Sequence, residues 1–460
     1  MDNRYITTTL IVAAVITTAT AQTVDVSAQA VQSSPRLVVS ITIDKLSTMQ
    51  LEKYAQAYGN GGFMRLISDG CVYSNGICTF TPVDRASGIA AIVTGTTPYY
   101  NGVTATNRLD RATLQPVSTI NGYAGNITCS TITDELKIST AGRGMAYSIA
   151  EDENTALITG GHAVDASIFI DDKGRWKVSL CNSSVDLSWL NAFNKLDNES
   201  SSTYAYERLT AMAAQCVQSA GMGLDAIPDI LTVTYTAVDS EDAYVSLDKS
   251  VASLMEKAES AAGKGNVLFV VSGDGCEERH TEDLKTYGIP TGTFNITRAQ
   301  SLLNMFLGAT YGDGKYAEAV FDNALFLNEK LIEQRGLNVQ AIEEASATFL
   351  KELSGVRNVY TRSAILTNRC PENRVVNAFN LTISGDLIIE IAPGWSLLNE
   401  NTQASYNVRA GIEPFPIIFY GCGIAKDTRH EAVASERIAP TIAKSIRIRA
   451  PNGCTAQPLF

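Results

Sequence analysis

Short runs of aliphatic and β-branched residues alternate with amphipathic stretches along most of the chain. The apolar runs Leu37–Ile43, Ile230–Val238 and Val267–Gly273 predict buried strands. Helical patterns follow them, among others at Thr48–Tyr58 and Asp242–Ala262. Because the strand–helix–strand order repeats, we expect an α/β fold with a mostly parallel sheet and helices on both faces.

The pattern changes between about residues 295 and 385, where an amphipathic helix at Val339–Leu353 lies among short strands. Those strands are expected at Tyr316–Val320, Ala324–Asn328 and Val359–Ala364. The runs Asp386–Ile391 and Phe415–Tyr420 again have the character of core strands. We therefore predict a core in two parts, 35–294 and 386–460, interrupted by a smaller α+β lobe at 295–385.

The first residues have the pattern of an export signal. Arg4 precedes the apolar run Leu10–Val15, and Ala19–Ala21 fits a small-x-small cleavage site. We expect a signal peptide at 1–21 and a flexible polar leader at 22–34, with an uncleaved anchor as the alternative. The run is too short to span a bilayer, so the prediction is a periplasmic or secreted bacterial protein without a membrane span after cleavage.

Composition narrows the possible partners. A net charge of −12, with no Lys/Arg-rich run, disfavours nucleic acids and anionic membrane surfaces. The nine cysteines all follow the predicted signal and include no CxxC pair, which argues against a structural zinc site. Cys71 and Cys78 are close enough in sequence that a disulfide across a turn is a possibility.

Three aspartates come at or just after the ends of the three long apolar runs: Asp44, Asp239 and Asp274. The carboxyl ends of parallel strands share one edge of a sheet, and ligand sites of open α/β sheets lie there. The pattern therefore predicts a metal or phosphate site built from these carboxylates.

A set of stretches in one order resembles the alkaline phosphatase superfamily, in its secreted bacterial branch near the type I phosphodiesterases and nucleotide pyrophosphatases. The stretches are PRLVVSITIDKL, GGFMRLISDGCVYSN, IVTGTTPYYNGVTATNRLDR, ITDELK, GGHAVDASIFID, PDILTVTYTAVD, DAYVSLD, VLFVVSGDG, NALFLNEKLI, GVRNVYTRSAI, SGDLIIEIAPGW and PIIFYG. They cover nearly the whole chain after the predicted signal. The resemblance implies a three-layer α/β/α sandwich with an inserted lobe.

The resemblance also implies a reaction. In that family three aspartates and three histidines hold two zinc ions, and a Thr or Ser attacks phosphorus. One ion activates the nucleophile and the other stabilises the leaving oxygen. Asp44, Asp239 and Asp274 match the family's aspartates, which makes them the expected metal ligands.

The family's histidine positions hold other residues. After Asp239 the chain runs through Ser240-Glu241 directly into a helix, and Gly275 follows Asp274. The stretch Gly411–Phe415, where the family has another histidine, contains none. Carboxylates alone make a poor zinc cage, so we expect no cofactor, or a divalent ion for which Mg²⁺ or Ca²⁺ is favoured over two Zn²⁺.

The nucleophile is also replaced. Counting back from the Thr-Gly pair that ends the following helix, Arg85 occupies the family's nucleophile position, while Asp152 and Asn154 occupy its basic phosphate-binding pair. Ser87 lies about 200° round the helix from Arg85. Thr81, in the preceding loop, stays open as another attacking hydroxyl.

Arg85 is a candidate replacement for the lost metal charge. With Asp84 as N-cap, Arg85 begins a helix, where a cation opposes the macrodipole at a cost of about 0.3–1 kcal/mol. By the family's geometry, Asp44 and Asp274 are the partners that would offset this cost. The alternative is an ordinary surface arginine.

The remaining candidates have plain alternatives. His162, in the GGH stretch, is expected to make structural hydrogen bonds, and His280 and His430 are expected on solvated surfaces. Asn107 falls on the family's substrate side, but its alternative is an ordinary turn asparagine.

We therefore expect an exported superfamily protein that has lost two-zinc phosphoester hydrolysis and has a binding or assembly role, its partner an unknown ligand or envelope protein. One alternative is an active phosphomonoesterase or phosphodiesterase with a non-standard metal set. Another alternative is a sugar- or envelope-binding module, although no motif in the sequence supports it.

Overall fold

The computed structural model describes residues 34–182, 185–196, 204–276, 288–400, 404–407 and 413–460. The predicted signal peptide and all but the last residue of the predicted leader lie outside these ranges. None of the described helices is long and apolar enough to cross a membrane.

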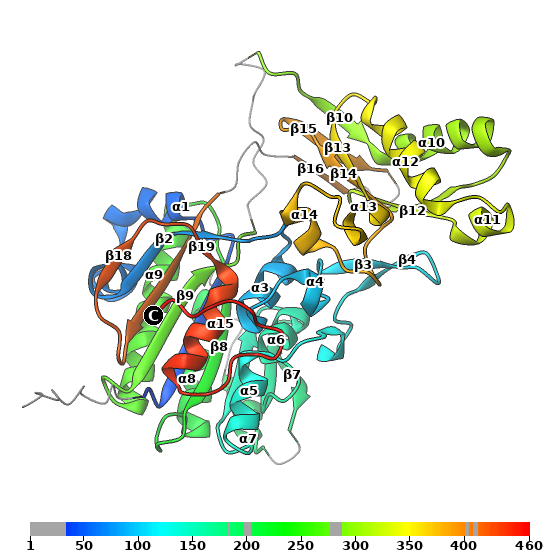
Figure 1. Ribbon diagram of the computed structural model, residues 1–460. Helices are drawn as coiled ribbons and strands as arrows, with labels where there is room; N and C mark the ends of the chain where they lie inside the picture. Colours follow the sequence, from blue (N-terminus) through cyan, green and yellow to red (C-terminus); the bar gives the residue numbers. More distant parts are fainter. Residues whose placement is uncertain (1–33, 183–184, 197–203, 277–287, 401–403, 408–412) are drawn as a thin grey trace, which may run out of the picture. The chain divides into compact units, whose positions relative to one another are not determined.

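A ten-stranded sheet forms the centre of the described chain (Figure 1). Its order is β18 (Asp427–Arg429), β2 (Cys71–Ile77), β17 (Phe415–Gly421), β9 (Val267–Gly273), β1 (Leu37–Asp44), β8 (Asp229–Thr236), β5 (Ala146–Ala150), β6 (Ala166–Ile170) and β7 (Trp176–Cys181), while β19 (Val433–Ala434) also pairs with β2. The strands around β1 are parallel, whereas β17 and β7 run antiparallel to their neighbours. The predicted mostly parallel α/β sheet is confirmed.

The residues of β1 alternate between two separate cores, one on each face of the sheet. Val39 and Ile41 pack with α8 (Tyr206–Ala220) and α9 (Glu241–Ala262). Val38 packs in the second core, which is lined by helices α3 (Arg85–Thr94), α5 (Ile132–Ser139), α6 (Glu153–Gly160) and α15 (Ile438–Ser445). Because each face is covered by helices, the chain has the expected three-layer α/β/α arrangement.

Shorter elements complete the core. They are α1 (Thr48–Lys53), α2 (Phe63–Asp69), α4 (Pro98–Asn101), α7 (Ser188–Leu196) and a hairpin of β3 (Asn107–Asp110) and β4 (Gln115–Ser118). An extended strand, β2, separates Cys71 from Cys78 by about 20 Å, too far for a disulfide. Both are free thiols, so the possible bridge between them is excluded.

The inserted lobe has its own core and two small sheets. Their strands are β11 (Ala317–Phe321), β12 (Ala324–Leu327), β14 (Leu387–Ile391) and β13 (Val356–Thr361) in one sheet, and β10 (Gly292–Asn295), β15 (Trp395–Asn399) and β16 (Ala404–Asn407) in the other. The lobe's helices are α10 (Ile296–Tyr311), α11 (Glu329–Gln334), α12 (Val339–Lys351), α13 (Arg362–Leu366) and α14 (Asn373–Ala378).

Two expectations for this region were wrong. The run Asp386–Ile391 was expected in the central sheet, but β14 pairs with β12 and β13, so the lobe extends beyond residue 385. The strand expected at Val359–Ala364 ends at Thr361, because the Thr361 side chain accepts a hydrogen bond from the Ala364 amide and caps α13. Hydrophobic pattern alone does not reveal which strand a given run will pair with.

Candidate functional site

Two of the three predicted aspartates meet at the carboxyl edge of the central sheet. Strands β1 and β9 are parallel neighbours whose last residues lie in register, so Asp44 and Asp274 leave the sheet side by side. Both are buried, at 2% and 0% exposure. The Asp274 Oδ1 atom accepts hydrogen bonds from the amides of Lys45 (3.3 Å) and Cys276 (3.0 Å).

The second oxygens of this pair, Asp44 Oδ1 and Asp274 Oδ2, accept no hydrogen bond from any other described residue. The two carboxyl groups instead bond each other. Burial raises the pKa of Asp44, although the nearby Arg85 charge and the bond with Asp274 act in the opposite direction. Burial also raises the pKa of Asp274 well above its usual value, and the charge of Asp44 and the bond with it add to this rise. Two buried carboxyl groups that bond each other favour holding one proton between them.

Arg85 lies beside this pair because of the way helix α3 begins. The Asp84 carboxylate accepts the Ala86 amide at 2.9 Å, and the Ser87 hydroxyl accepts the Asp84 amide at 2.9 Å, which completes a capping box. The expected N-cap is therefore confirmed. Ser87 serves the cap, and Arg85 takes the first helical position.

The Arg85 guanidinium bridges two carboxylates. Its Nε lies 3.5 Å from Asp44 Oδ2, and its Nη1 lies 3.3 Å from Asp152 Oδ2. Burial opposes the charge on Arg85, but Asp44 and Asp152 outweigh it and raise its pKa. Asp274 contributes through charge alone. The expected pairing with Asp44 is present, whereas Asp274, the other expected partner, makes no ion pair with Arg85. Asp152 is a partner that the sequence did not predict.

Asp152 also caps a helix, a role that could have been predicted from the sequence. It is the N-cap of α6, and its Oδ1 accepts the Thr155 amide at 3.0 Å. The start of α6 therefore faces the start of α3 with a carboxylate opposite a guanidinium. At the position where the resemblance expects a phosphate-binding base, the chain has an acid whose preceding residue, Glu151, is acidic too.

Asp239 makes different contacts. Its Oδ1 accepts hydrogen bonds from Tyr54 Oη at 2.8 Å and Lys53 Nζ at 3.2 Å, both contributed by the end of α1. Asp239 follows the end of β8 by three residues, while Asp44 is the last residue of its strand. The metal-ligand role of all three aspartates stays a prediction.

The donor set does not fit a two-zinc centre. Across the described residues, no three His, Cys, Asp or Glu side chains are placed so that together they could hold a metal ion. His162 bonds Asp134, His430 Nδ1 lies 2.8 Å from Ser74 Oγ, and His280 lies outside the described residues. Arg85 already lies against Asp44. Since zinc in water-accessible protein sites prefers imidazole and thiolate ligands, this arrangement offers too few of them.

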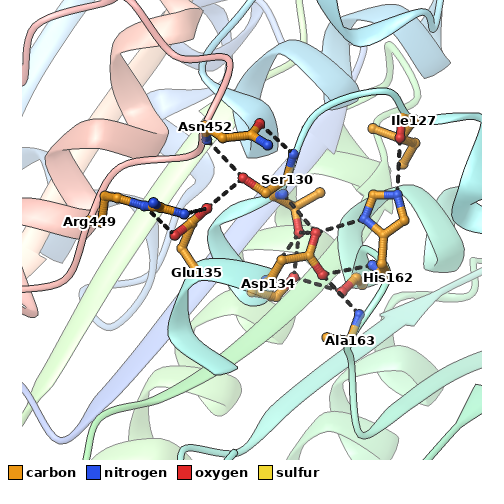
Figure 2. Close-up of polar contacts among 11 residues, drawn as sticks. Ile127, Ser130, Asp134, Glu135, His162, Ala163, Arg449 and Asn452 are labelled. Carbon is orange, nitrogen blue, oxygen red and sulfur yellow. Dashed lines mark hydrogen bonds and ion pairs between the residues drawn. The ribbon is translucent and has the colours of Figure 1, made fainter. Parts of the chain in front are cut away.

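The GGH histidine belongs to a hydrogen-bonded network at α5 (Figure 2). His162 Nδ1 lies 2.8 Å from Asp134 Oδ2, and Nε2 lies 3.0 Å from the Ile127 carbonyl. Hydrogen bonding to Asp134 raises the pKa of His162, whereas burial opposes it. Burial acts to raise the pKa of Asp134 as well, but the His162 and Thr131 hydrogen bonds outweigh it and lower that pKa. The structural role expected for His162 agrees with these contacts.

The chain is similar in sequence to known alkaline phosphatases. No family model matches the chain. Alkaline phosphatase PafA of Elizabethkingia meningoseptica is 22% identical over 92% of this chain and 94% of its own length. Alkaline phosphatase PhoV of Synechococcus elongatus is 23% identical, with 91% of each chain covered.

Solved structures give the same fold. The crystal structure of wild-type PafA matches with a TM-score of 0.81 at 21% identity, covering 93% of this chain and 98% of that one. A murine ectonucleotide pyrophosphatase/phosphodiesterase 5 matches with a TM-score of 0.56 at 13% identity, covering 90% and 95%. The expected alkaline phosphatase superfamily, with nucleotide pyrophosphatase-like relatives, is thus confirmed for the fold.

Proposed function

We propose that this chain is an alkaline phosphatase superfamily protein that has lost two-zinc phosphoester hydrolysis and uses its scaffold for binding or assembly. Fold kinship alone would suggest a phosphatase, but function is decided by the residues of the site. The observation that carries the proposal is the contact of the Arg85 guanidinium with Asp44 and Asp152, at the position that the family resemblance assigns to the nucleophile.

The charges around Arg85 support the proposal. A phosphate ester brings negative charge, and the residues near Arg85 are mainly acids: Asp44 and Asp152 contact the guanidinium, and Asp274 and Glu151 act on it through their charge. Binding phosphate would place like charges together, which costs free energy in a partly buried site. An arginine also lacks a nucleophilic atom at neutral pH, because its guanidinium stays protonated.

Metal analysis of the purified protein beside an aryl-phosphate assay tests this proposal. We expect no stoichiometric zinc and no release of nitrophenol above background with added Zn²⁺, Mg²⁺ or Ca²⁺. We also expect Arg85→Thr to remain inactive, since a restored hydroxyl does not replace the missing imidazoles. Two equivalents of bound zinc, or activity that Asp274→Ala abolishes, would overturn the proposal.

The buried Asp44 and Asp274 oxygens, which no donor outside this pair of carboxyl groups satisfies, favour one alternative, an active esterase with a hard divalent ion. Activity that depends on Mg²⁺ or Ca²⁺ and disappears with Asp44→Asn would establish it. Export to the periplasm or the exterior belongs to the proposal as well. Cell fractionation of the full chain, beside a variant lacking residues 1–21, checks that part.

A further inference from the structure

A pocket lies between the loop before α3, the β3–β4 hairpin and the lobe. Its walls come from the loop before α3, the segment leading into β3, the β11–β12 turn, α14 and the start of β14. The lining residues that matter here are Asn107, Arg108, Asp322, Phe326, Ala378 and Phe379. No role for this pocket follows from the proposed loss of hydrolysis.

The size and lining of the pocket suit one ring. Its volume is about 100 Å³. An engineered apolar cavity of about 150 Å³ in another protein holds benzene, so this smaller, partly open space admits one small ring at most. Leu109 and Ile388 line it alongside Phe326 and Phe379, and aromatic and aliphatic walls favour an apolar guest.

The charges of the lining oppose one another. Arg108 and Asp322 are its charged residues, of opposite sign. A cationic guest is therefore attracted by Asp322 but repelled by Arg108, and an anionic guest the reverse. A neutral guest is repelled by neither side chain. Asn107 and Ser384 are polar lining residues. The Ser384 hydroxyl accepts the Asn380 amide at 2.9 Å and keeps its own proton to donate to a guest hydroxyl.

The walls are held in place by contacts across the hairpin and the lobe. Arg111 of the hairpin turn places Nη2 3.0 Å from Oδ1 of the buried Asp386, which precedes β14. The same guanidinium lies over the Phe326 ring at 4.9 Å. Thr106, which leads into β3, donates its amide and hydroxyl to Asp84 Oδ1 at 2.6 and 2.8 Å. A pocket with restrained walls loses less conformational entropy on binding.

We propose that this pocket binds the aromatic ring of a small neutral ligand of the phenol class. The ring packs among Phe326, Phe379 and Ala378, and the hydroxyl meets the polar groups of Asn107 or Ser384.

Fluorine NMR of 4-fluorophenol, titrated with the purified full chain in metal-free buffer, tests the proposal. We expect saturable broadening of the fluorine signal, competed by unlabelled phenol, and much weaker binding of 4-fluorobenzoate and 4-fluorobenzylammonium. Ala378→Phe fills the pocket and should weaken binding by more than about tenfold, since a buried ring contributes more than about 1.4 kcal/mol.

Ala112→Phe is the matched control, because Ala112 is exposed in the β3–β4 turn and does not line the pocket. It should bind like the wild type, and circular dichroism confirms that each variant is folded. The proposal is overturned by non-saturable wild-type binding, by wild-type affinity in Ala378→Phe, or by equal binding of the charged probes. Because the titration contains no metal and no phosphate ester, its failure leaves the hydrolysis proposal standing, and the reverse holds too.

Discussion

Two clusters of buried carboxylates, one at α5 and one at the carboxyl edge of the sheet, are built on opposite principles. At α5, the Asp134 oxygens accept bonds from the amides of Thr131, His162 and Ala163 and from two side chains. The neighbouring Glu135 is paired on both oxygens with Arg449, at 2.9 and 3.0 Å. Figure 2 shows both carboxylates facing their donors.

At the sheet edge, one oxygen of Asp44 and one of Asp274 have no donor among the described residues other than the carboxyl group of the pair, and Arg85 Nε and Nη2 make no hydrogen bond. A satisfied network is what a structural site requires, because each unpaired buried group costs free energy. Unpaired groups concentrate where function is or was located. The difference indicates that the sheet-edge cluster was not shaped for stability.

The largest expected effect comes from Asp134→Ala. Removing this carboxylate leaves three amides and the His162 ring without their acceptor, so the free energy of unfolding should fall by about 3 kcal/mol. Urea unfolding followed by circular dichroism measures it. Asp274→Asn is the matched change at the sheet edge and should be neutral or stabilising by up to about 1 kcal/mol, since it removes the repulsion between two buried acids. Equal losses of unfolding free energy in the two variants would show that the two carboxylate clusters do not differ in their contribution to stability.

Arg85→Ala should have an intermediate effect. Without the guanidinium, the buried Asp44 carboxylate loses its counter-charge, which we expect to cost about 2 kcal/mol of stability. In an Asp44→Asn background the same substitution should cost less than about 1 kcal/mol, because no buried charge remains to be balanced. A double-mutant cycle by urea unfolding gives the coupling. Additive losses would show that Arg85 does not balance Asp44.

The two clusters should respond to pH in opposite directions. Asp134 has a lowered pKa, so its contribution is complete above the unfolded value of about 3.8 and is lost as pH falls through the folded pKa. Asp274 has a raised pKa, so its contribution is complete below about 3.8 and is lost as pH rises through the folded pKa. Unfolding free energies of Asp134→Asn and Asp274→Asn across this range should diverge from the wild type with opposite slopes.

His162 adds a smaller effect near neutrality. Its pKa is raised, so its stabilisation is complete below about 6.5 and is lost as pH rises through the folded value. The ring is 35% exposed, and solvent screening limits the loss to about 0.5 kcal/mol. His162→Gln should remove this part of the pH dependence in thermal unfolding between pH 6 and 9. An unchanged profile would show that the His162–Asp134 contact contributes nothing through charge.

The smallest effect is expected at Asp239, which the sequence grouped with the other two aspartates. Its contact with Lys53 is exposed to solvent, so Lys53→Ala should leave the urea midpoint unchanged within error. A clear loss would mean that Asp239 depends on this pair as Asp134 depends on its donors.

The sequence predicted the sheet and its edge because hydrophobic period and strand length are local signals. It placed Asp44 and Asp274 together and made Asp84 the cap of the Arg85 helix, both as found. It misplaced β14, since an isolated apolar run can pair in either sheet. It did not find Asp152 as the second partner of Arg85, because that contact depends on two helix starts being brought face to face.

The sequence by itself therefore determined the three-layer scaffold, and it led to the prediction that the nucleophile and the histidines of the family are replaced, because both depend on residue type and order. Only the tertiary structure decided that Arg85 bridges Asp44 and Asp152, that Asp239 bonds with Lys53 and Tyr54, and that a small pocket lies between the loop before α3, the β3–β4 hairpin and the lobe. The physical reason is the distance along the sequence over which each signal acts. Strand and cap patterns depend on a few neighbouring residues. The contacts decided by the structure join distant segments that meet only after the sheet and the lobe have packed.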